Sequence, residues 1–368
     1  MENDKTSYPV IIVGGGPAGL ATSLTLHFRG INHCMVEALA HPVAKPGEAI
    51  PPNARPLLKQ LGIESLLQTA PHRVYHGNKS CWGTDLLLDK DHLFEPHEHG
   101  YLLNRTAFEG DLQQVVKDQY TPFFNGYRVK TVEQKQDGYH MTIDNGQEKQ
   151  LIVGEFLVDA TGRKASICRQ LGIRKVALDE QFALIVQLET AEYLSHQIWI
   201  EATENGWWYL APLAGKKLSL MFFTLKALLP QRNVATFLEH AWRQTKHLAA
   251  LIQEIDFNAY SIGIRPAGTS YLPQPFGQNW LAVGDAAYAY DPISSFGITS
   301  ALAGGFYAGH ALADWLAGKQ EALSVYRYVV ENAFRAYLQK LEKHYDLEQR
   351  WSNSPYWSQR LVHQRNLV

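Results

Sequence analysis

A glycine-rich loop near the start of the chain restricts the possible folds more than any other segment does. The loop carries Gly14, Gly16, Pro17, Ala18 and Gly19, and it connects a short β-branched apolar run to a segment with helical spacing of apolar residues. In such loops the first glycine permits a tight turn out of a strand, the second lets the backbone approach a pyrophosphate, and the third allows close helix–strand packing. The N–H groups at the helix start attract an anion. The loop therefore predicts a dinucleotide-binding unit.

The segment that follows the loop supplies the acidic residue expected of this unit. Residues 17–29 are predicted to form a helix, and residues 32–37 form a second strand that ends at Glu37. An acid about twenty residues beyond the glycines belongs where the ribose of a dinucleotide is bound. The structural alternatives are an ordinary glycine turn and a solvated strand end. The order of strand, loop, helix, strand and acid favours the nucleotide.

A second motif lies in the middle of the chain. A strongly apolar run at 152–160 leads through Asp159 and Thr161 to Gly162, and a helix is expected after it. Taken alone, this motif is equally well explained as a structural strand–turn–helix connection.

A third motif follows an apolar strand expected at 279–284. Gly284 and Asp285 end that strand, and the chain continues through Pro292 to Gly297 and Ile298, which open a helix predicted over 297–317. An aspartate at a strand end can accept hydrogen bonds from a polyol, and the N–H groups of a helix start favour negative charge on a bound ligand. The alternative for Asp285 is a helix N-cap.

Between the second and third motifs the hydrophobic pattern changes from helical to alternating. Residues 182–190, 196–202 and 218–224 alternate as strands do, which predicts an antiparallel sheet with one packed face and one open face. A helical insert is expected at about 231–254.

The chain thus divides into two discontinuous modules, and ligands often bind between such modules. The nucleotide module is expected at 1–70, 100–170 and 265–318, the substrate module at 71–99 and 171–264, and a C-terminal helix and tail at 319–368.

The composition limits which binding partners and which cellular compartment we expect for this protein. The formal net charge of −2 provides no global field that would attract nucleic acid or anionic lipid. No apolar run reaches membrane-spanning length, and the first five residues lack the features of a signal peptide. The three cysteines have no paired spacing, which favours a reducing compartment. We therefore expect a cytoplasmic protein that binds neither nucleic acid nor membrane.

The three motifs together resemble those of the flavoprotein aromatic hydroxylases, the FAD-dependent class A monooxygenases with the p-hydroxybenzoate hydroxylase fold. The resemblance implies an α/β (α+β overall) fold, in which a Rossmann-like FAD-binding domain carries an inserted antiparallel-sheet substrate domain. It implies FAD as the resident dinucleotide, with Gly162 among its contacts. It also implies that Arg105 lies near the flavin and that Val129 contacts the cofactor. The alternative for Arg105 is a surface residue at a helix start.

Two shorter stretches give a finer resemblance. Residues 45–52, which include Glu48, and residues 78–83 are similar to those of flavin-dependent tryptophan halogenases and of tryptophan-modifying maturases. The chain looks most like the maturases that accompany glycine and lysine oxidases carrying cysteine tryptophylquinone. Halogenases usually carry Trp-x-Trp-x-Ile-Pro, whereas residues 207–212 place Tyr209 and Ala211 at the second tryptophan and the isoleucine. This departure favours oxygen transfer over halogenation.

The resemblance implies a monooxygenase that hydroxylates a tryptophan in the precursor of a quinone-cofactor amino-acid oxidase. Electrons would come from NAD(P)H or a separate flavin reductase, and the oxygen from O₂. Glu48 is the candidate acid/base or positioning residue, and Tyr209 and Trp207 are candidates for the substrate side. The structural alternatives are loop bracing and aromatic packing. Small-molecule hydroxylation, halogenation, prenyl reduction and a non-enzymatic docking role remain open.

Two remaining features have no assigned chemistry. Histidines cluster in the 71–99 region without the spacing of a zinc enzyme, so no metal site is predicted; they are His72, His76, His92, His97 and His99. The helix expected at 320–348 and the tail after it are aromatic and basic, and they either pack back on the nucleotide module or form a partner surface.

Overall fold

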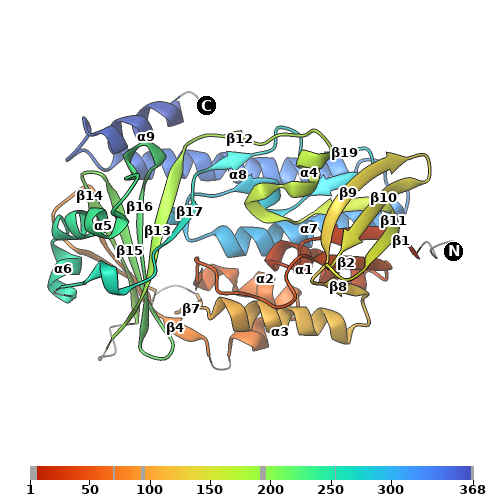
Figure 1. The fold of residues 1–368 in the computed structure, drawn as a ribbon, viewed down its shortest axis with the longest axis horizontal. Helices are drawn as coiled ribbons and strands as arrows, with labels where there is room; N and C mark the ends of the chain where they lie inside the picture. The colour runs from red at the N-terminus through yellow and green to blue at the C-terminus, as the bar shows by residue number, and fades with distance from the viewer. Residues whose placement is uncertain (1–5, 69–70, 93–95, 191–195, 253, 366–368) are drawn as a thin grey trace.

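The computed structural model describes residues 6–68, 71–92, 96–190, 196–252 and 254–365, and side chains as far as Arg360 (Figure 1). Met1–Lys5, whose polar sequence entered the expectation about the compartment, lie outside the described residues. Among the described residues, no helix combines the length and apolar character needed to cross a lipid bilayer.

A mixed sheet with a parallel centre forms the nucleotide module. Strand β1 (Thr6–Val13) lies between β11 (Lys149–Asp159) and β2 (His33–Glu37) and is parallel to both, and β11 is also parallel to β20 (Trp280–Ala282). The register pairs Val13 with Asp159 and Val36, and Asp159 with Ala282, so four strands end at the same edge. In spatial order the other strands are β19 (Phe276–Gly277), β20 (Trp280–Ala282), β11 (Lys149–Asp159), β2 (His33–Glu37) and β8 (Phe123–Asn125), with β10 (Gly138–Asp144) and β9 (Arg128–Lys135) continuing antiparallel from β11.

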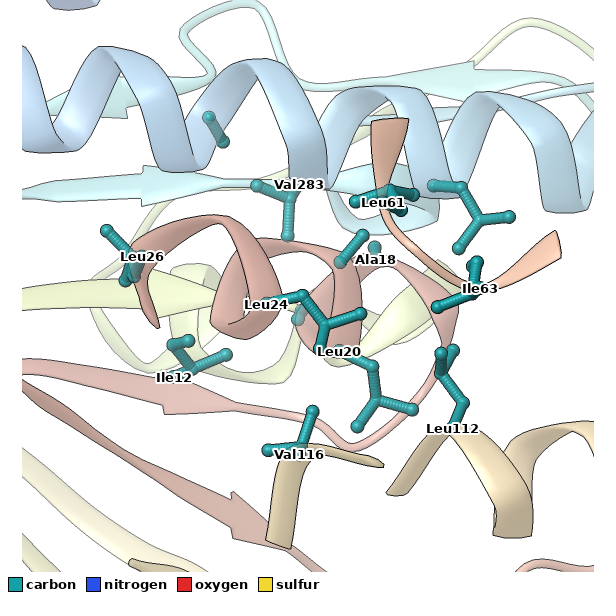
Figure 2. Close-up of a cluster of buried hydrophobic side chains, with 14 of the residues drawn as sticks. Ile12, Ala18, Leu20, Leu24, Leu26, Leu61, Ile63, Leu112, Val116 and Val283 are labelled. Atoms are coloured by element: carbon teal, nitrogen blue, oxygen red, sulfur yellow. The ribbon is translucent and has the colours of Figure 1, made fainter. Parts of the chain in front are cut away.

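Helices α1 (Pro17–Phe28) and α7 (Gly297–Leu316) pack so closely that the backbone of α7 contacts α1. A Cβ atom added to Gly305 would lie 2.2 Å from the carbonyl oxygen of Ala18, and one on Gly309 would lie 2.6 Å from Cβ of Thr25. Helix α3 (Arg105–Asp118) also packs on α1, and Figure 2 shows Leu20 of α1 above Leu112 and Val116 of α3. This packing joins the body of α7 to α1, directly after the glycine loop.

A second, seven-stranded sheet forms the expected substrate module. Its neighbours are antiparallel, except that β14 and β5 are parallel. The order is β17 (Gly263–Pro266), β13 (Gln181–Glu189), β16 (Lys217–Leu225), β15 (Gly206–Leu213), β14 (Gln197–Thr203), β5 (Gly77–Cys81) and β6 (Leu88–Asp91). The Rossmann-like unit with a second, largely antiparallel sheet is confirmed; the bounds of the two modules stay a prediction.

The prediction that this sheet has one open face is wrong. The insert predicted at 231–254 forms two helices, α5 (Val234–Arg243) and α6 (His247–Leu251), and these cover the face that carries Trp208. Helices α8 (Ala322–Asp346) and α9 (Pro355–Arg365) cover part of the face that carries Trp207 (Figure 1). Both faces are therefore apolar, and β15 is buried almost throughout.

The C-terminal aromatic residues pack back on the protein. Tyr326 and Phe334 of α8 join the cores of the nucleotide module, and Tyr345 and Trp357 join the core against the second sheet. Of the two alternatives for this segment, packing is therefore the one observed for these side chains. The tail's Arg365 lies beyond the described side chains.

The remaining elements are short. Two three-stranded sheets connect the modules, β3 (Ala49–Ile50) with β7 (Gly100–Leu102) and β4 (Arg73–Tyr75), and β12 (Val176–Ala177) with β18 (Ser270–Tyr271) and β21 (Tyr288–Ala289). Helices α2 (Arg55–Gln60) and α4 (Ser166–Gln170) complete the described fold.

The packing of α1 on α7 predicts opposite effects for two helix-interior glycines. Gly305→Ala should lower the free energy of unfolding by about 1–3 kcal/mol, because the new methyl group overlaps the α1 backbone. Gly110→Ala in α3 should raise it by up to about 1 kcal/mol, because its Cβ meets nothing closer than 3.9 Å and alanine favours the helix. Urea unfolding measures both. Equal effects of the two substitutions would contradict the proposed backbone contact.

Candidate functional site

The three glycines of the first loop are required for different reasons. Gly14 has a φ of +115°, and a Cβ there would lie 2.2 Å from the carbonyl oxygen of Ala160. A Cβ on Gly19 would lie 2.0 Å from the carbonyl oxygen of Gly14. A Cβ on Gly16, in contrast, would meet no atom within 4 Å. The protein's own packing therefore requires Gly14 and Gly19, whereas Gly16 leaves open space in front of the start of α1.

Glu37 lies beside this loop at the end of β2. Its carboxylate accepts a hydrogen bond from the N–H of Gly15 at 2.5 Å and another from the N–H of Leu39 at 2.8 Å. On the other side of the loop, the buried Gln113 of α3 donates to the carbonyl oxygen of Gly15 at 3.1 Å. Sequence reasoning gave no role to Gln113, because its partner is distant in the chain.

The second motif has a largely structural explanation. The carboxylate of Asp159 accepts hydrogen bonds from the N–H groups of Thr161, Ile167 and Cys168, and so it holds the turn and the start of α4. Gly162 has a φ of +68°, and a Cβ there would meet no atom within 4 Å. Asp159 is therefore a bracing residue, and Gly162 stays a predicted cofactor contact.

Asp285 lies at the same edge, held by two basic residues. Arg163 pairs with its carboxylate, Nε to Oδ2 at 3.3 Å, and also donates to the carbonyl oxygen of Tyr290 at 2.6 Å. Lys175 donates to the backbone carbonyl of Asp285, and burial lowers the pKa of Lys175 to about 8. The carboxylate of Asp285 is still partly exposed. Sequence reasoning gave no role to Arg163 or Lys175.

The third motif continues into a short loop, residues 291–297, that we call the α7 loop. It begins with a 3₁₀ turn (Pro292–Ser294) capped by the side chain of Asp291, and it ends at Gly297, where α7 starts. A Cβ on Gly297 would meet no atom within 4 Å, whereas Ile298 is buried. The start of α7 therefore also faces open space.

Arg105 holds a different loop, residues 45–48, from the start of α3. Its guanidinium donates to the carbonyl oxygens of Pro46 at 3.1 Å and Gly47 at 2.7 Å and pairs with Glu109. Lys45 pairs with the same Glu109 at 2.5 Å. Arg105 is thus not a surface residue: it fixes the backbone directly before Glu48.

Glu48 is the most unusual side chain of the site. It is only 5% exposed, its Oε1 accepts a hydrogen bond from Ser219 of β16 at 2.9 Å, and its Oε2 has no hydrogen-bond partner among the described residues. Burial raises the pKa of this carboxyl, and the bond from Ser219 and the charge of Arg105 offset part of that rise. Glu48 therefore presents an unsatisfied carboxyl oxygen next to the second sheet.

Tyr209 lies on the face of the second sheet that Glu48 approaches. It is opposite Met221 of β16, and burial together with the Glu48 carboxyl raises its pKa. Trp207 stacks on Phe223 with ring centroids 4.0 Å apart, so aromatic packing explains this residue. The structure thus brings together Glu48 and Tyr209 but assigns Trp207 to the core.

Val129 lies in the sheet of the nucleotide module, apart from the second sheet that carries Tyr209. Val129 is on β9, opposite Ile143 of β10, and packs on the hydrophobic cluster that contains Val36 of β2. Among the histidines, His99 contacts Arg55 at 2.8 Å. Within the described part of the chain, no three His, Cys, Asp or Glu side chains come together so that they could hold a metal ion.

The fold and the glycine loop define an FAD-dependent oxidoreductase. The family model of the FAD binding domain matches residues 7–338, and the chain belongs to that family. LodB of Marinomonas mediterranea, named as an FAD-dependent oxidoreductase, is 26% identical over 96% of this chain and 97% of its own. The resemblance to FAD-dependent hydroxylases and halogenases is thereby confirmed, as is FAD as the dinucleotide.

Solved structures agree with this fold. The myxobacterial chondrochloren halogenase CndH has a TM-score of 0.86 at 20% identity, covering 96% of this chain and 86% of its own. QhpG, a peptidyl tryptophan dihydroxylase essential for tryptophylquinone cofactor biogenesis, has a TM-score of 0.81 at 21% identity, covering 96% and 79%. At these identities the likeness concerns the fold.

Gly16 and Gly297, two of the site glycines whose Cβ positions are open, suit FAD, because a pyrophosphate and a flavin ring need close approach to backbone N–H groups. Within the first glycine loop, the open Gly16 and the tightly packed Gly14 should respond differently to substitution. Gly16→Leu should weaken FAD binding by on the order of 100-fold or more, because its side chain occupies the space for the pyrophosphate, while the apoprotein keeps its melting temperature. Gly14→Val should instead lower the melting temperature of the apoprotein, because it overlaps the Ala160 backbone. Titration of apoprotein with FAD and thermal unfolding distinguish them; an unchanged FAD affinity in Gly16→Leu would be incompatible with this site.

Proposed function

We propose that this protein is an FAD-dependent monooxygenase that hydroxylates a tryptophan in the precursor of a tryptophylquinone-containing amino-acid oxidase. The unsatisfied Oε2 of Glu48, on the face that carries Tyr209, is the observation that carries the proposal. The likeness to LodB over nearly the whole chain and the fold shared with QhpG support the substrate class.

Glu48 would bind the indole N–H of the substrate. A buried polar atom without a partner costs about 1–3 kcal/mol, so Oε2 gains free energy when a ligand donates a hydrogen bond to it. Ser219 already donates to Oε1, which fixes the plane of the carboxyl group. An indole has one N–H donor on an otherwise apolar ring, and this matches one acceptor on an apolar face. Glu48 is also the group that would take up or return the indole proton.

The surroundings of Glu48 would hold the ring and exclude water. Tyr209, Met221 and Ile185 lie side by side on β15, β16 and β13, and all three belong to or pack on the same hydrophobic cluster. Such a lining orients an aromatic substrate and limits the loss of a reactive oxygen species to water.

We place FAD along the shared strand edge. Gly14, Gly16, Pro17, Ala18 and Gly19 would hold the pyrophosphate, Glu37 the ribose and Asp285 the ribityl chain, with Gly162, Gly284 and Val129 as further contacts. Pro292, Gly297 and Ile298 would lie at the flavin ring, and Arg105 would fix the loop beside it.

When bound and reduced by NAD(P)H or a separate flavin reductase, FAD with O₂ supplies an electrophilic oxygen atom. The balance is one oxygen atom inserted into a ring C–H bond and one released as water, with two electrons from the reductant and two protons taken up. The N–H groups at the start of α7 would stabilise negative charge at the flavin ring. Arg105 holds the loop at residues 45–48, Arg163 holds Asp285 and the backbone at Tyr290, and neither guanidinium is expected to exchange protons.

Halogenation is the second candidate, because the halogenase CndH shares the fold. Tyr209 and Ala211 stand where the halogenase pattern has tryptophan and isoleucine, and this favours oxygen transfer. Hydroxylation of a free aromatic molecule and prenyl reduction use the same scaffold, and so these also remain alternatives.

Mass spectrometry of a co-expressed precursor protein tests the substrate. We expect the mass of one or more oxygen atoms on a tryptophan of the precursor, found only with the flavin-loaded enzyme. The Gly16→Leu variant serves as the cofactor-free control. Unmodified tryptophan in the presence of the reduced, loaded enzyme would reject the proposal. A chlorine mass would favour halogenation, and oxidation of a free aromatic molecule alone would favour the small-molecule alternative.

Glu48→Gln separates a functional role from loop bracing. Glutamine keeps an acceptor for Ser219 but removes the buried acid, so the variant should be inactive and yet more stable than the wild type at neutral pH. The native pKa of Glu48 lies above that of the unfolded chain, so wild-type stability falls as pH rises through this interval. The advantage of Glu48→Gln should therefore be small near pH 4 and grow toward neutral pH, which thermal unfolding measures. Full activity in this variant would assign Glu48 to bracing; Ser219→Ala is the matched control for the hydrogen bond alone.

A further inference from the structure

A buried arginine on α9 contacts the first residue of the α7 loop. Arg360 is 1% exposed at its side chain, and one of its terminal nitrogens, Nη2, pairs with the carboxylate of Asp291, the first residue of the loop. The other, Nη1, lies 2.8 Å from the carboxylate of Asp179. Its guanidinium also stands 4.2 Å from the ring centroid of Tyr345. Figure 1 shows α9 lying over one end of the second sheet, far in sequence from both carboxylates.

Asp291 is held by side chains from three elements. It is fully buried; its Oδ1 accepts a hydrogen bond from the N–H of Ile293 at 2.9 Å. Its Oδ2 accepts from Gln181 of β13 and from Tyr345 of α8, each at 3.1 Å. Its backbone N–H donates to the hydroxyl oxygen of Tyr337 at 2.6 Å. The start of the α7 loop is therefore fixed by β13, α8 and α9 in addition to the hydrogen bond within the loop.

Asp179 connects Arg360 to two of the places where the chain passes between the two modules. Its carboxylate accepts hydrogen bonds from the N–H of Gln181 at the start of β13 and from the N–H of Thr269 after β17, both at 3.0 Å. These two segments lead into and out of the second sheet. Through its two nitrogens, Arg360 thus joins both crossings to the α7 loop.

Arg360 supplies the positive charge that offsets the buried carboxylates of Asp291 and Asp179. Burial raises the pKa of Asp291, and the adjacent Arg360 counteracts this rise. Removing one member of a buried ion pair leaves an uncompensated charge, which costs more than removing both. The planar guanidinium can face two carboxylates at once, whereas a lysine ammonium is a single point charge.

We propose that Arg360 is a positioning residue for the flavin: by pairing with Asp291 and Asp179 it fixes the α7 loop relative to the face that carries Tyr209 and Glu48. The inference rests on the proposed placement of the flavin ring at Pro292, Gly297 and Ile298. Arg360 is not a catalytic residue, because it acts on the cofactor only through Asp291.

The test compares Arg360→Met with the double variant Arg360→Met/Asp291→Asn in the full-length chain. The probes are FAD affinity and the visible circular dichroism of bound FAD, measured between pH 5 and 9. Arg360→Met should bind FAD on the order of tenfold more weakly at neutral pH, with an altered dichroism spectrum. The double variant should recover part of the affinity, since no uncompensated aspartate remains at position 291. Arg360→Lys should behave like Arg360→Met and not like the wild type.

The pH dependence distinguishes positioning from a general loss of packing. Without Arg360, the titratable groups that remain around Asp291 are the carboxylate of Asp179 and the hydroxyl groups of Tyr337, Tyr345 and Tyr356, and these hydroxyl groups stay uncharged because the tyrosine pKa values lie above their usual range. Asp291 then keeps its proton to higher pH in the native state than in the unfolded chain. The FAD affinity of Arg360→Met should therefore fall as pH rises above the ordinary aspartate range, and this fall should be absent in the double variant.

Two control variants separate the role of Arg360 from general destabilisation and from the placement of the flavin. Arg350→Met removes another arginine of the C-terminal segment, which pairs with Glu348 and Asp85, so it should lower the melting temperature without changing the dichroism of FAD. Gly297→Val should change that dichroism if the α7 loop contacts the flavin. No effect of Gly297→Val would overturn the flavin placement and with it the role of Arg360. An effect of Gly297→Val with a normal, pH-independent Arg360→Met would overturn the role of Arg360 alone, and neither result bears on tryptophan oxygenation.

Discussion

The whole arrangement depends on backbone segments that approach one another at the end of the parallel sheet. Glycines permit this approach: a side chain on Gly19 would overlap the Gly14 carbonyl, one on Gly284 would lie 2.6 Å from Ala18, and one on Gly305 would overlap the Ala18 carbonyl. These contacts bring the start of α1, the end of β20 and the body of α7 together. A long, flat cofactor can lie across this edge only because no side chains separate the segments.

Local sequence predicted those parts of the fold and site that depend on local geometry. The glycine loop, Glu37 and Gly284-Asp285 lie where their spacing in the sequence predicts, because strand ends and turns impose residue types over a few positions. Asp159 shows the limit of this reasoning: its motif was visible, but its carboxylate serves the turn itself. The covered second sheet was not predictable from alternation, because alternation does not show that the helical insert α5 and α6 packs on one face or that the distant α8 and α9 pack on the other.

The remaining misses share one cause, which is distance along the chain. Arg163 meets Asp285, Gln113 meets the glycine loop, and Arg360 meets Asp291 across 69 residues. Isolated basic or amide residues carry no pattern that identifies such partners. Glu48 is different, because its loop is recognisable in the sequence, yet its burial and its unsatisfied oxygen depend on β16 and on Arg105. The sequence of the loop identified Glu48 as a candidate. The packing of both modules explains why one of its carboxyl oxygens is free to accept a hydrogen bond.

The anchoring of the α7 loop by α8 and α9 also orders events during synthesis of the protein. A ribosome makes the glycine loop first, the α7 loop much later, and Tyr337, Tyr345 and Arg360 later still. A nascent chain that has already folded its parallel strands can bind the adenosine half of the cofactor. The α7 loop, which we assign to the flavin ring, has no positive charge beside Asp291 until Arg360 of α9 has been translated. Stable incorporation of the cofactor would then follow translation of α9, and folding of the α7 loop and loading of the cofactor would be completed together.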